Sequence, residues 1–163
     1  MHTSTFSENP LAMRAGLATL DVLEQEDLGS RAARLGEQLR VRLREELLSY
    51  EMVKEVRGAG LLSGIEFTAP GNLCLRLPFE AFRHIHAGMF GQVMVMRLFR
   101  DKNILTQICG NNFMVLKVAP PLVVSESQAE RFVDAIRDVV ELVHSSHTFW
   151  SEALGLARRA INV

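Results

Sequence analysis

Two groups of side chains in this 163-residue sequence have types and positions suited to binding an anion. The first is the hydroxyl cluster Thr3, Ser4 and Thr5, which precedes the helix-opening pair Asn9-Pro10 by a few residues. Hydroxyl groups and backbone N–H donors near the start of a helix can converge on a phosphate. A frayed, polar chain end has the same composition, and on local sequence alone it is the favoured interpretation.

The second group is a single residue, Lys117, a lone cation in the apolar segment 113–118. On a strand it shares a face with Phe113 and Val115, and an unpaired ammonium among apolar groups is strongly unfavourable. The Lys117 side chain must therefore reach solvent at the strand end, pair with a carboxylate or bind an anionic ligand.

The histidines do not predict a metal site. His84 and His86 are two residues apart, which places them on different faces of a helix. His144 and His147 have a spacing that zinc sites use, but no carboxylate or thiolate completes the set, so we interpret them as surface residues near a helix C-terminus. The sequence also contains no P-loop, zincin or nucleophile-elbow motif.

Composition favours a soluble cytoplasmic protein. The 18 basic and 19 acidic residues give a net charge of −1, which excludes the dense positive field that nucleic acids or anionic membranes demand. The first residues lack the basic and apolar regions of a signal peptide, and no uncharged apolar run approaches membrane-spanning length. Cys74 and Cys109 lie far apart, and we interpret both as buried, reduced side chains.

Helical periodicity predicts four main helices and a short one in the tail. Their expected ranges are 10–27, 28–47, 79–100, 125–143 and 149–161. Gly29-Ser30 is the expected break after the first helix, and Pro78 is expected to open the third. Asn9-Pro10 is a favourable helix start, and Ser125 with Gln128 forms a capping box. The five arginines between Arg31 and Arg44 are expected on a solvated face of the second helix.

A period of two predicts strands from Val53 to Phe67, with Ser63 and Ile65 on one face and Gly64 and Glu66 on the other. Gly58 and Gly60 indicate a bend or a close backbone approach in this stretch. Segments 104–109 and 113–118 are two short strands whose connection has a hairpin composition. The expected fold class is α+β, a small, mostly antiparallel sheet with helices packed over one face.

Four blocks of sequence resemble, in order, the C-terminal part of class III aminotransferases. This pyridoxal-phosphate-dependent group of fold type I includes ornithine, acetylornithine, 4-aminobutyrate and putrescine aminotransferases. The blocks are HTSTFSENPLA at 2–12, ATLDVLE at 18–24, VRGAGLLSGIE at 56–66 and VLKVAPPLVV at 115–124. The segments 79–100 and 147–163 match no motif of the family.

The resemblance implies roles for three residues. Thr5, helped by Ser4, would hydrogen-bond the phosphate of the pyridoxal 5'-phosphate bound by the neighbouring subunit of a homodimer, which reverses the frayed-end interpretation. Lys117 would contact the substrate carboxylate, at a place where arginine is common in the family. Lysine lacks the bidentate fork of arginine, so a tight carboxylate clamp is not expected. Ser7-Glu8 replaces two glycines usual in the family, and Thr3 stands where glycine is common.

The family's Schiff-base lysine precedes the hydroxyl cluster, as do the aromatic residue that stacks on the cofactor and the aspartate that faces its pyridine nitrogen. Transamination needs that lysine, and none of Lys54, Lys102 and Lys117 lies in a context to replace it. We therefore expect a C-terminal fragment of a transaminase that carries no catalytic lysine and is inactive alone. The full enzyme would move an amino group from an amine or ω-amino acid to a 2-oxo acid.

The expected division is a phosphate loop and interdomain helix at 1–28, a small C-terminal α+β domain at 29–146 and a helical tail at 147–163. Expected partners are the small-molecule substrates and either a second copy or the large domain, without nucleic acid or membrane. One alternative is a non-enzymatic assembly or interaction module that kept the small-domain fold. Another is an enzyme whose lysine-bearing half is a separate chain.

Overall fold

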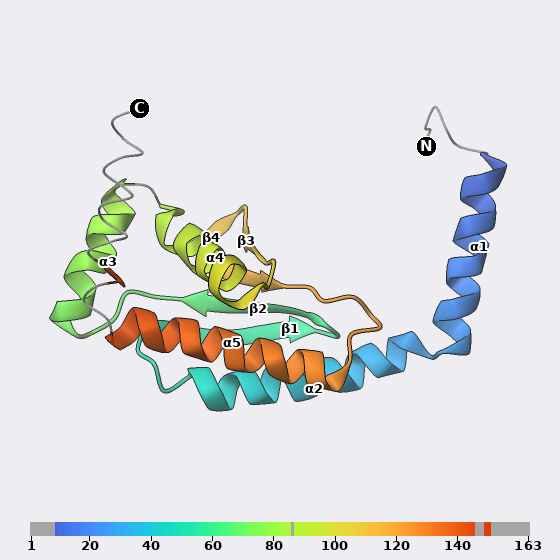
Figure 1. Ribbon diagram of the computed structural model, residues 1–163, viewed down its shortest axis with the longest axis horizontal. Helices are drawn as coiled ribbons and strands as arrows, with labels where there is room; N and C mark the ends of the chain where they lie inside the picture. The colour runs from blue at the N-terminus through green and yellow to red at the C-terminus, as the bar shows by residue number, and fades with distance from the viewer. Residues whose placement is uncertain (1–8, 86, 146–148, 151–163) are drawn as a thin grey trace.

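The computed structural model describes residues 9–85, 87–145 and 149–150. Within them, helices and strands follow the order α1-α2-β1-β2-α3-α4-β3-β4-α5 (Figure 1). The helices are α1 Pro10–Gln25, α2 Leu28–Leu47, α3 Leu73–Ile85, α4 Met89–Lys102 and α5 Glu126–Ser145. The strands are β1 Val53–Ala59, β2 Leu62–Phe67, β3 Gln107–Cys109 and β4 Asn112–Val118.

The four strands form one antiparallel sheet in the order β1-β2-β4-β3. Strands β2 and β4 are therefore central, although the 44 residues 68–111 separate them in the chain. Ile65 of β2 pairs with Val56 of β1 and with Leu116 of β4, so these three apolar residues share one face of the sheet. The predicted α+β class is confirmed.

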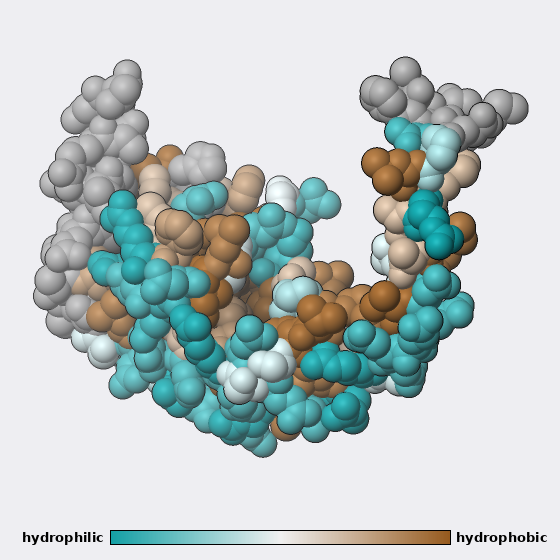
Figure 2. All heavy atoms as spheres, turned by 45° about the vertical axis from the view of Figure 1, so that its right-hand side comes forward, coloured by the Kyte–Doolittle hydropathy of each residue, from teal (hydrophilic) through white to brown (hydrophobic). Residues whose placement is uncertain are grey.

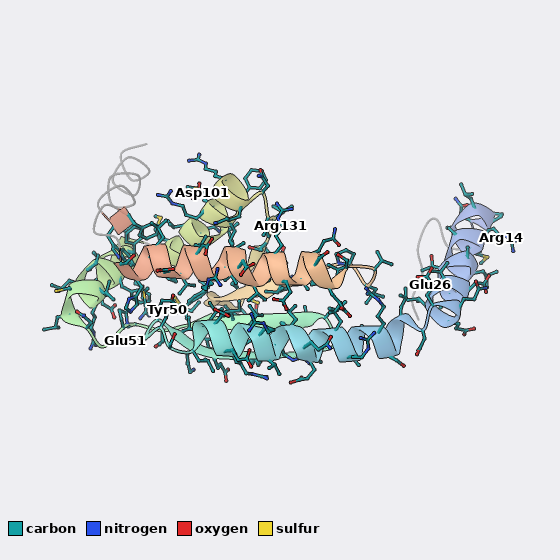
Figure 3. The ribbon with its side chains drawn as sticks, turned by 60° about the horizontal axis from the view of Figure 1, so that its bottom comes forward. Arg14, Glu26, Tyr50, Glu51, Asp101 and Arg131 are labelled. Carbon is teal, nitrogen blue, oxygen red and sulfur yellow. The ribbon has the colours of Figure 1, made fainter. Side chains whose placement is uncertain are left out.

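Three helices lie side by side over that apolar face. Helix α2 packs on β1 and on α5, while α4 packs on α5, β3 and β4, and Figure 3 shows α2 and α5 next to each other in front of the sheet. The helices contribute fully buried side chains to the core, including Leu43 and Leu47 from α2, Met94 and Leu98 from α4, and Val133 and Ile136 from α5. Each such side chain stabilises the fold by about 1.5–3 kcal/mol.

The predicted helix starts at Asn9 and Ser125 are confirmed. The Asn9 side chain accepts the N–H of Leu11 at 3.0 Å. The capping box is reciprocal, because the Ser125 N–H donates to Gln128 Oε1 at 2.9 Å and the Gln128 N–H donates to Ser125 Oγ at 3.1 Å.

The predicted break at Gly29-Ser30 is wrong, because both residues lie in the first turn of α2. The chain turns two residues earlier, at Asp27, whose φ of 43° is left-handed. A short polar side chain tolerates that conformation better than most. Ser30 Oγ donates to Asp27 Oδ1 at 2.9 Å and so bonds the turn to the helix start.

The single helix expected over 79–100 is also wrong, because α3 and α4 are separate helices. Helix α3 begins at Leu73, where the Asn72 side chain accepts the N–H of Cys74 at 2.9 Å, and Pro78 lies inside it. The expectation of two buried cysteines fails too, since Cys74 is exposed and Cys109 is half-buried.

The strand expected over 104–109 is confined to Gln107–Cys109. The reason lies at the end of α4, where Asn103 adopts a left-handed φ of 56° and the Ile104 N–H still donates to the Leu98 carbonyl. The chain becomes extended only after this helix C-cap is complete.

The arginine-rich side of α2 is only partly a solvated face, which corrects a further prediction. Arg40 is 5% exposed and donates to the Gly60 carbonyl oxygen, while its guanidinium pairs with Glu37 at 2.8 Å. Arg31 donates to the carbonyl oxygens of Leu122 and Val124. The planar, five-donor guanidinium suits such contacts, because it can bond loop carbonyls that have no partner in the sheet.

Helix α1 extends away from the two-layer body formed by the sheet and the helices that cover it, and it contacts mainly α2 (Figure 1). None of its residues is buried, and its apolar side chains lie at the surface, Leu11 with 80% of its area exposed (Figure 2). An isolated helix of this length is only marginally stable in water. Within the described residues, α1 therefore gains little from tertiary packing.

Gly36 marks the closest approach of α2 to the sheet. A Cβ atom at this position would lie 1.8 Å from the Gly60 carbonyl oxygen and 2.9 Å from the Leu61 nitrogen. Gly60 itself has a φ of 53° in the turn between β1 and β2, as expected for a bend at this place. The absence of a side chain at Gly36 thus allows the turn to rest directly on the helix.

Substituting Gly36 by alanine is expected to lower the free energy of unfolding by about 1–3 kcal/mol, because backbone would have to move. Gly29→Ala is the matched control in the same helix, since no atom lies within 4 Å of its added Cβ. That control should raise the stability by up to about 1 kcal/mol, the helix propensity gain of alanine. Urea unfolding followed by circular dichroism measures both, and equal stability of the two variants would contradict the packing argument.

Candidate functional site

Ser4 and Thr5 lie outside the described residues. Their contact with a phosphate stays a prediction. In the sequence, Thr5 precedes Asn9, the N-cap residue of α1, by four positions.

Lys117 lies on the central strand β4, on the sheet face opposite the helices. Its neighbours along the chain, Leu116 and Val118, are buried in the core, and strand alternation directs Lys117 the other way. Its cross-strand neighbours are Gly64 on β2 and Gln107 on β3. The Lys117 side chain is half-buried at this position.

Gly64, the residue opposite Lys117, lies close to the side chain of Val115. A Cβ atom at Gly64 would already lie 3.1 Å from Val115 Cγ1. Val115 is 4% exposed although it lies on the face away from the helices. A larger residue than glycine at position 64 would crowd the stretch of β4 that carries Lys117.

An ion-pair network lies next to Lys117 on the same face. The Glu66 carboxylate receives a hydrogen bond from Lys54 at 2.7 Å and another from Arg57, which also contacts Glu55. The hydrogen bonds from Lys54 and then Arg57 hold the pKa of the Glu66 carboxyl below its usual range, and Glu66 raises the pKa of Lys54 in turn. Glu66 is therefore ionised and fully engaged at neutral pH.

Of the three outcomes expected for Lys117, pairing with a carboxylate is not found among the described residues. Its ammonium forms no hydrogen bond and no ion pair there. Within the described part of the chain, solvent and an anionic ligand remain as its possible partners.

The other two lysines have structural roles. Lys54 bonds Glu66, and Lys102 at the end of α4 donates to Asp138 of α5 at 2.6 Å. The hydrogen bond from Lys102 lowers the pKa of the Asp138 carboxyl and bonds the two helices together.

Of the four histidines considered in the sequence, His84 and His144 lie within the described residues. His84 lies on α3, and His144 near the end of α5 contacts the Tyr50 ring edge-on, with centroids 5.5 Å apart. His86 and His147 lie outside the described residues. No group of histidine, cysteine and acidic side chains in the described ranges could hold a metal ion.

A groove of about 410 Å³ lies beside the segment that follows Lys117. Pro120, Pro121, Leu105 and Phe132 are among the residues that line it. Arg131, labelled in Figure 3, lies at this groove and donates to the Lys102 carbonyl oxygen at 3.2 Å. The groove could not be found from the sequence, because it forms where three distant parts of the chain meet. These are the end of α4, the segment 119–121 with Pro120 and Pro121 (the proline segment), and α5.

Sequence reasoning also missed the network around Glu66 and the anchoring of the proline segment by Arg31. The sequence did contain a signal for the Glu66 network, since the period of two placed Glu66 on the same face as Gly64. No sequence signal distinguishes Arg31 from the other arginines of α2, because its carbonyl acceptors come from residues about ninety positions away.

None of the helices in the described part of the chain is long and apolar enough to cross a membrane.

Comparisons with known proteins agree with this fold. The mitochondrial ornithine aminotransferase of Arabidopsis thaliana is 32% identical over 142 residues, which cover 86% of this chain and 26% of that protein. The acetylornithine aminotransferase of Mycolicibacterium smegmatis is 34% identical over 141 residues, covering 86% of this chain and 30% of that protein. The crystal structure of the Toxoplasma gondii ornithine aminotransferase matches with a TM-score of 0.68 at 31% identity, over 87% of this chain and 29% of that one.

The chain thus spans between a quarter and a third of the length of these relatives. The family model for class III aminotransferases matches residues 1–140, which include the hydroxyl cluster, the sheet and Lys117. The chain therefore belongs to the class III aminotransferase family.

Proposed function

We propose that this chain forms the small C-terminal domain of a class III transaminase and part of its active site. The full enzyme transfers an amino group from an amine or ω-amino acid to a 2-oxo acid. In the proposed division, residues 1–28 are the phosphate loop and interdomain helix, 29–146 the small domain and 147–163 a helical tail. The exposed apolar residues of α1 support an interdomain position, because the rest of the described chain does not cover them.

The observation that carries the proposal is the position of Lys117. Lys117 is half-buried on the face of the sheet away from the helices, opposite a glycine, and no described carboxylate neutralises its ammonium. A substrate carboxylate supplies the charge that this site lacks. Since lysine is a point charge, it attracts the carboxylate without fixing its plane.

The names of the relatives support the substrate class. They include aminotransferases of ornithine and acetylornithine, and a diaminobutyrate–2-oxoglutarate aminotransferase of Rhizobium meliloti, 33% identical over 140 residues. All three amino donors are diamino acids or a derivative of one. We propose an amine-bearing donor of this kind and a 2-oxo acid acceptor for the full enzyme.

Pyridoxal 5'-phosphate is the proposed cofactor, and when bound it supplies the electron sink for moving the amino group. The described residues do not make up a site for it by themselves. Thr5 and Ser4 are the proposed phosphate contacts, donating their hydroxyl hydrogens to the cofactor bound by the neighbouring subunit of a homodimer. Both residues precede the described chain, so no geometry is assigned to them.

No lysine of this chain is proposed as the Schiff-base lysine. Such a residue needs a neutral amine, which neighbouring carboxylates oppose. Lys54 and Lys102 are both ion-paired, at 2.7 and 2.6 Å, and Glu66 raises the pKa of Lys54. Lys117 is assigned to the substrate. The chain alone is therefore proposed to be inactive.

The isolated chain tests this assignment. Incubated with pyridoxal phosphate and reduced with borohydride, it should show no specific cofactor adduct at Lys54, Lys102 or Lys117 by peptide mass spectrometry. It should also show no donor-dependent turnover. A stoichiometric adduct at one lysine, together with turnover, would contradict the proposal that the catalytic lysine lies elsewhere.

A chimera tests the transaminase function itself. This chain replaces the matching segment of the Mycolicibacterium smegmatis acetylornithine aminotransferase, and amino transfer to 2-oxoglutarate is measured. We expect activity, and we expect Thr5→Ala to weaken retention of the cofactor roughly tenfold, the effect of losing a hydrogen bond to a charged group.

Thr19→Ala is the matched control for Thr5→Ala, since Thr19 Oγ1 donates to the Ala15 carbonyl of its own helix, at 2.8 Å. It should leave cofactor retention unchanged. An inactive but folded chimera that associates with itself would favour the assembly module over the enzyme.

Lys117→Gln in the same chimera should raise the KM for 2-oxoglutarate roughly tenfold or more, because a charged partner of the carboxylate is lost. Lys117→Arg should retain or lower that KM, and it should favour donors with a fixed α-carboxylate. Lys102→Gln removes a lysine that is paired elsewhere and serves as the control. Similar KM values for Lys117→Gln and the control would exclude Lys117 from substrate binding.

A further inference from the structure

The sheet face that carries Lys117 holds an uneven set of charges. Lys54, Glu55, Arg57 and Glu66 are two cations and two anions joined by ion pairs. Lys117 is the remaining charge on this face among the residues that the register places there. The set as a whole therefore has one excess positive charge, and it resides on Lys117.

Glu66 is the described carboxylate that the sheet register places nearest to Lys117. It pairs with Val115 across β2 and β4, and Lys117 pairs with Gly64, two residues further along each strand. Residues in this diagonal relation have Cα atoms roughly 7–8 Å apart, which long side chains bridge. An unengaged Glu66 would consequently be an internal partner for the Lys117 ammonium.

The structure shows why this pair does not form. Glu66 Oε1 accepts from Lys54 at 2.7 Å, and Oε2 accepts from Arg57, so both oxygens are engaged from β1, on the side away from β4. The Glu66 side chain is only 13% exposed, which limits its freedom to turn. Lys54 and Arg57 thus direct the carboxylate toward the edge of the sheet.

We propose that Lys54 and Arg57 are positioning residues for the substrate carboxylate, because they hold Glu66 away from Lys117 and leave its ammonium open to an external carboxylate. This inference rests on the proposed function of Lys117. Removing both cations frees Glu66 to pair with Lys117, and the internal carboxylate then competes with the substrate.

The test uses the full 163-residue chain and needs no cofactor. Its lysines are labelled by reductive ¹³C-methylation, which keeps their charge, and the three side-chain signals are assigned with Lys54→Gln and Lys102→Gln. Glutarate, a dicarboxylate without a reactive carbonyl, is titrated while the Lys117 signal is followed by NMR. Wild-type chain is expected to bind with a saturable shift at Lys117.

The double variant Lys54→Gln/Arg57→Gln should bind glutarate roughly two- to fivefold more weakly, the effect of one competing surface ion pair. Its crystal structure should show the Glu66 carboxylate within ion-pair distance of Lys117. Both substituted side chains are about half exposed, so the fold should persist, which an amide spectrum verifies. Should the double variant unfold, Arg57→Gln alone frees Oε2 and takes its place.

Two triple variants of equal net charge separate positioning from general electrostatics. Adding Glu66→Gln to the double variant removes the competitor and should restore binding. Adding Glu55→Gln changes the charge equally but leaves the competitor, and Glu55 lies on the edge strand β1, one strand further from Lys117. This control should restore binding little.

Equal rescue by the two triple variants, or undiminished binding by the double variant, would overturn the positioning role while leaving the function of Lys117 intact. Absence of any glutarate shift at Lys117 in the wild-type chain would instead overturn the anion site and with it the proposed role of Lys117.

Discussion

The pairing of β2 with β4 is the constraint on which the rest of the molecule depends. It joins two segments that are distant in the chain and makes them the central strands, with β1 and β3 as the edges. Because the side-chain period of a strand is two, a slip of one residue would move Leu116 and Val118 out of the core and Lys117 into it. The burial of those two apolar residues thus fixes the outward position of the lysine.

The helical layer depends on the same strand pairing, because the pairing determines which face of the sheet is apolar. Helices α2, α5 and α4 cover the apolar face. Helix α2 approaches the turn between β1 and β2 so closely that position 36 requires glycine. Where the sheet ends and loops begin, side chains replace the sheet's own hydrogen bonds. Arg40 donates to the Gly60 carbonyl oxygen. Arg31 donates to the carbonyl oxygens of Leu122 and Val124, which follow the proline segment in the chain.

These arginine contacts give the ends of the sheet a definite geometry without enlarging the core. A charged donor to a backbone carbonyl contributes more than a neutral one, typically about 1.5–3 kcal/mol. Arg31 acts on the segment that directly follows Lys117, so the strand end that carries the candidate site is bonded to α2 as well as to its neighbouring strands.

The sequence was sufficient for features that depend on local periodicity. The helix starts at Asn9 and Ser125 follow from residue spacing within one element, and so do the two faces of β2. The α+β class follows from the order of the elements that this spacing predicts. The position of the break between α1 and α2 and the start of α3 did not follow, because Asp27 and Asn72 decide them through a left-handed turn and a side-chain cap. In both cases a glycine or proline nearby gave a stronger signal. The partners of Arg31, Arg40 and Glu66 could not be predicted, since they depend on tertiary contacts between distant segments.

The choice of lysine for the proposed substrate contact at position 117 agrees with its surroundings. A guanidinium would bring five fixed donors to a strand position flanked by Gly64 and Gln107, and it would demand a planar partner for two of them. An ammonium has three donors that rotate, so it accepts a carboxylate from several directions and requires only that no internal carboxylate reach it first. Under the proposed roles, the ion pairs of Glu66 meet that requirement from the adjoining strand, so the charge balance of β1 and β2 would influence anion binding at β4.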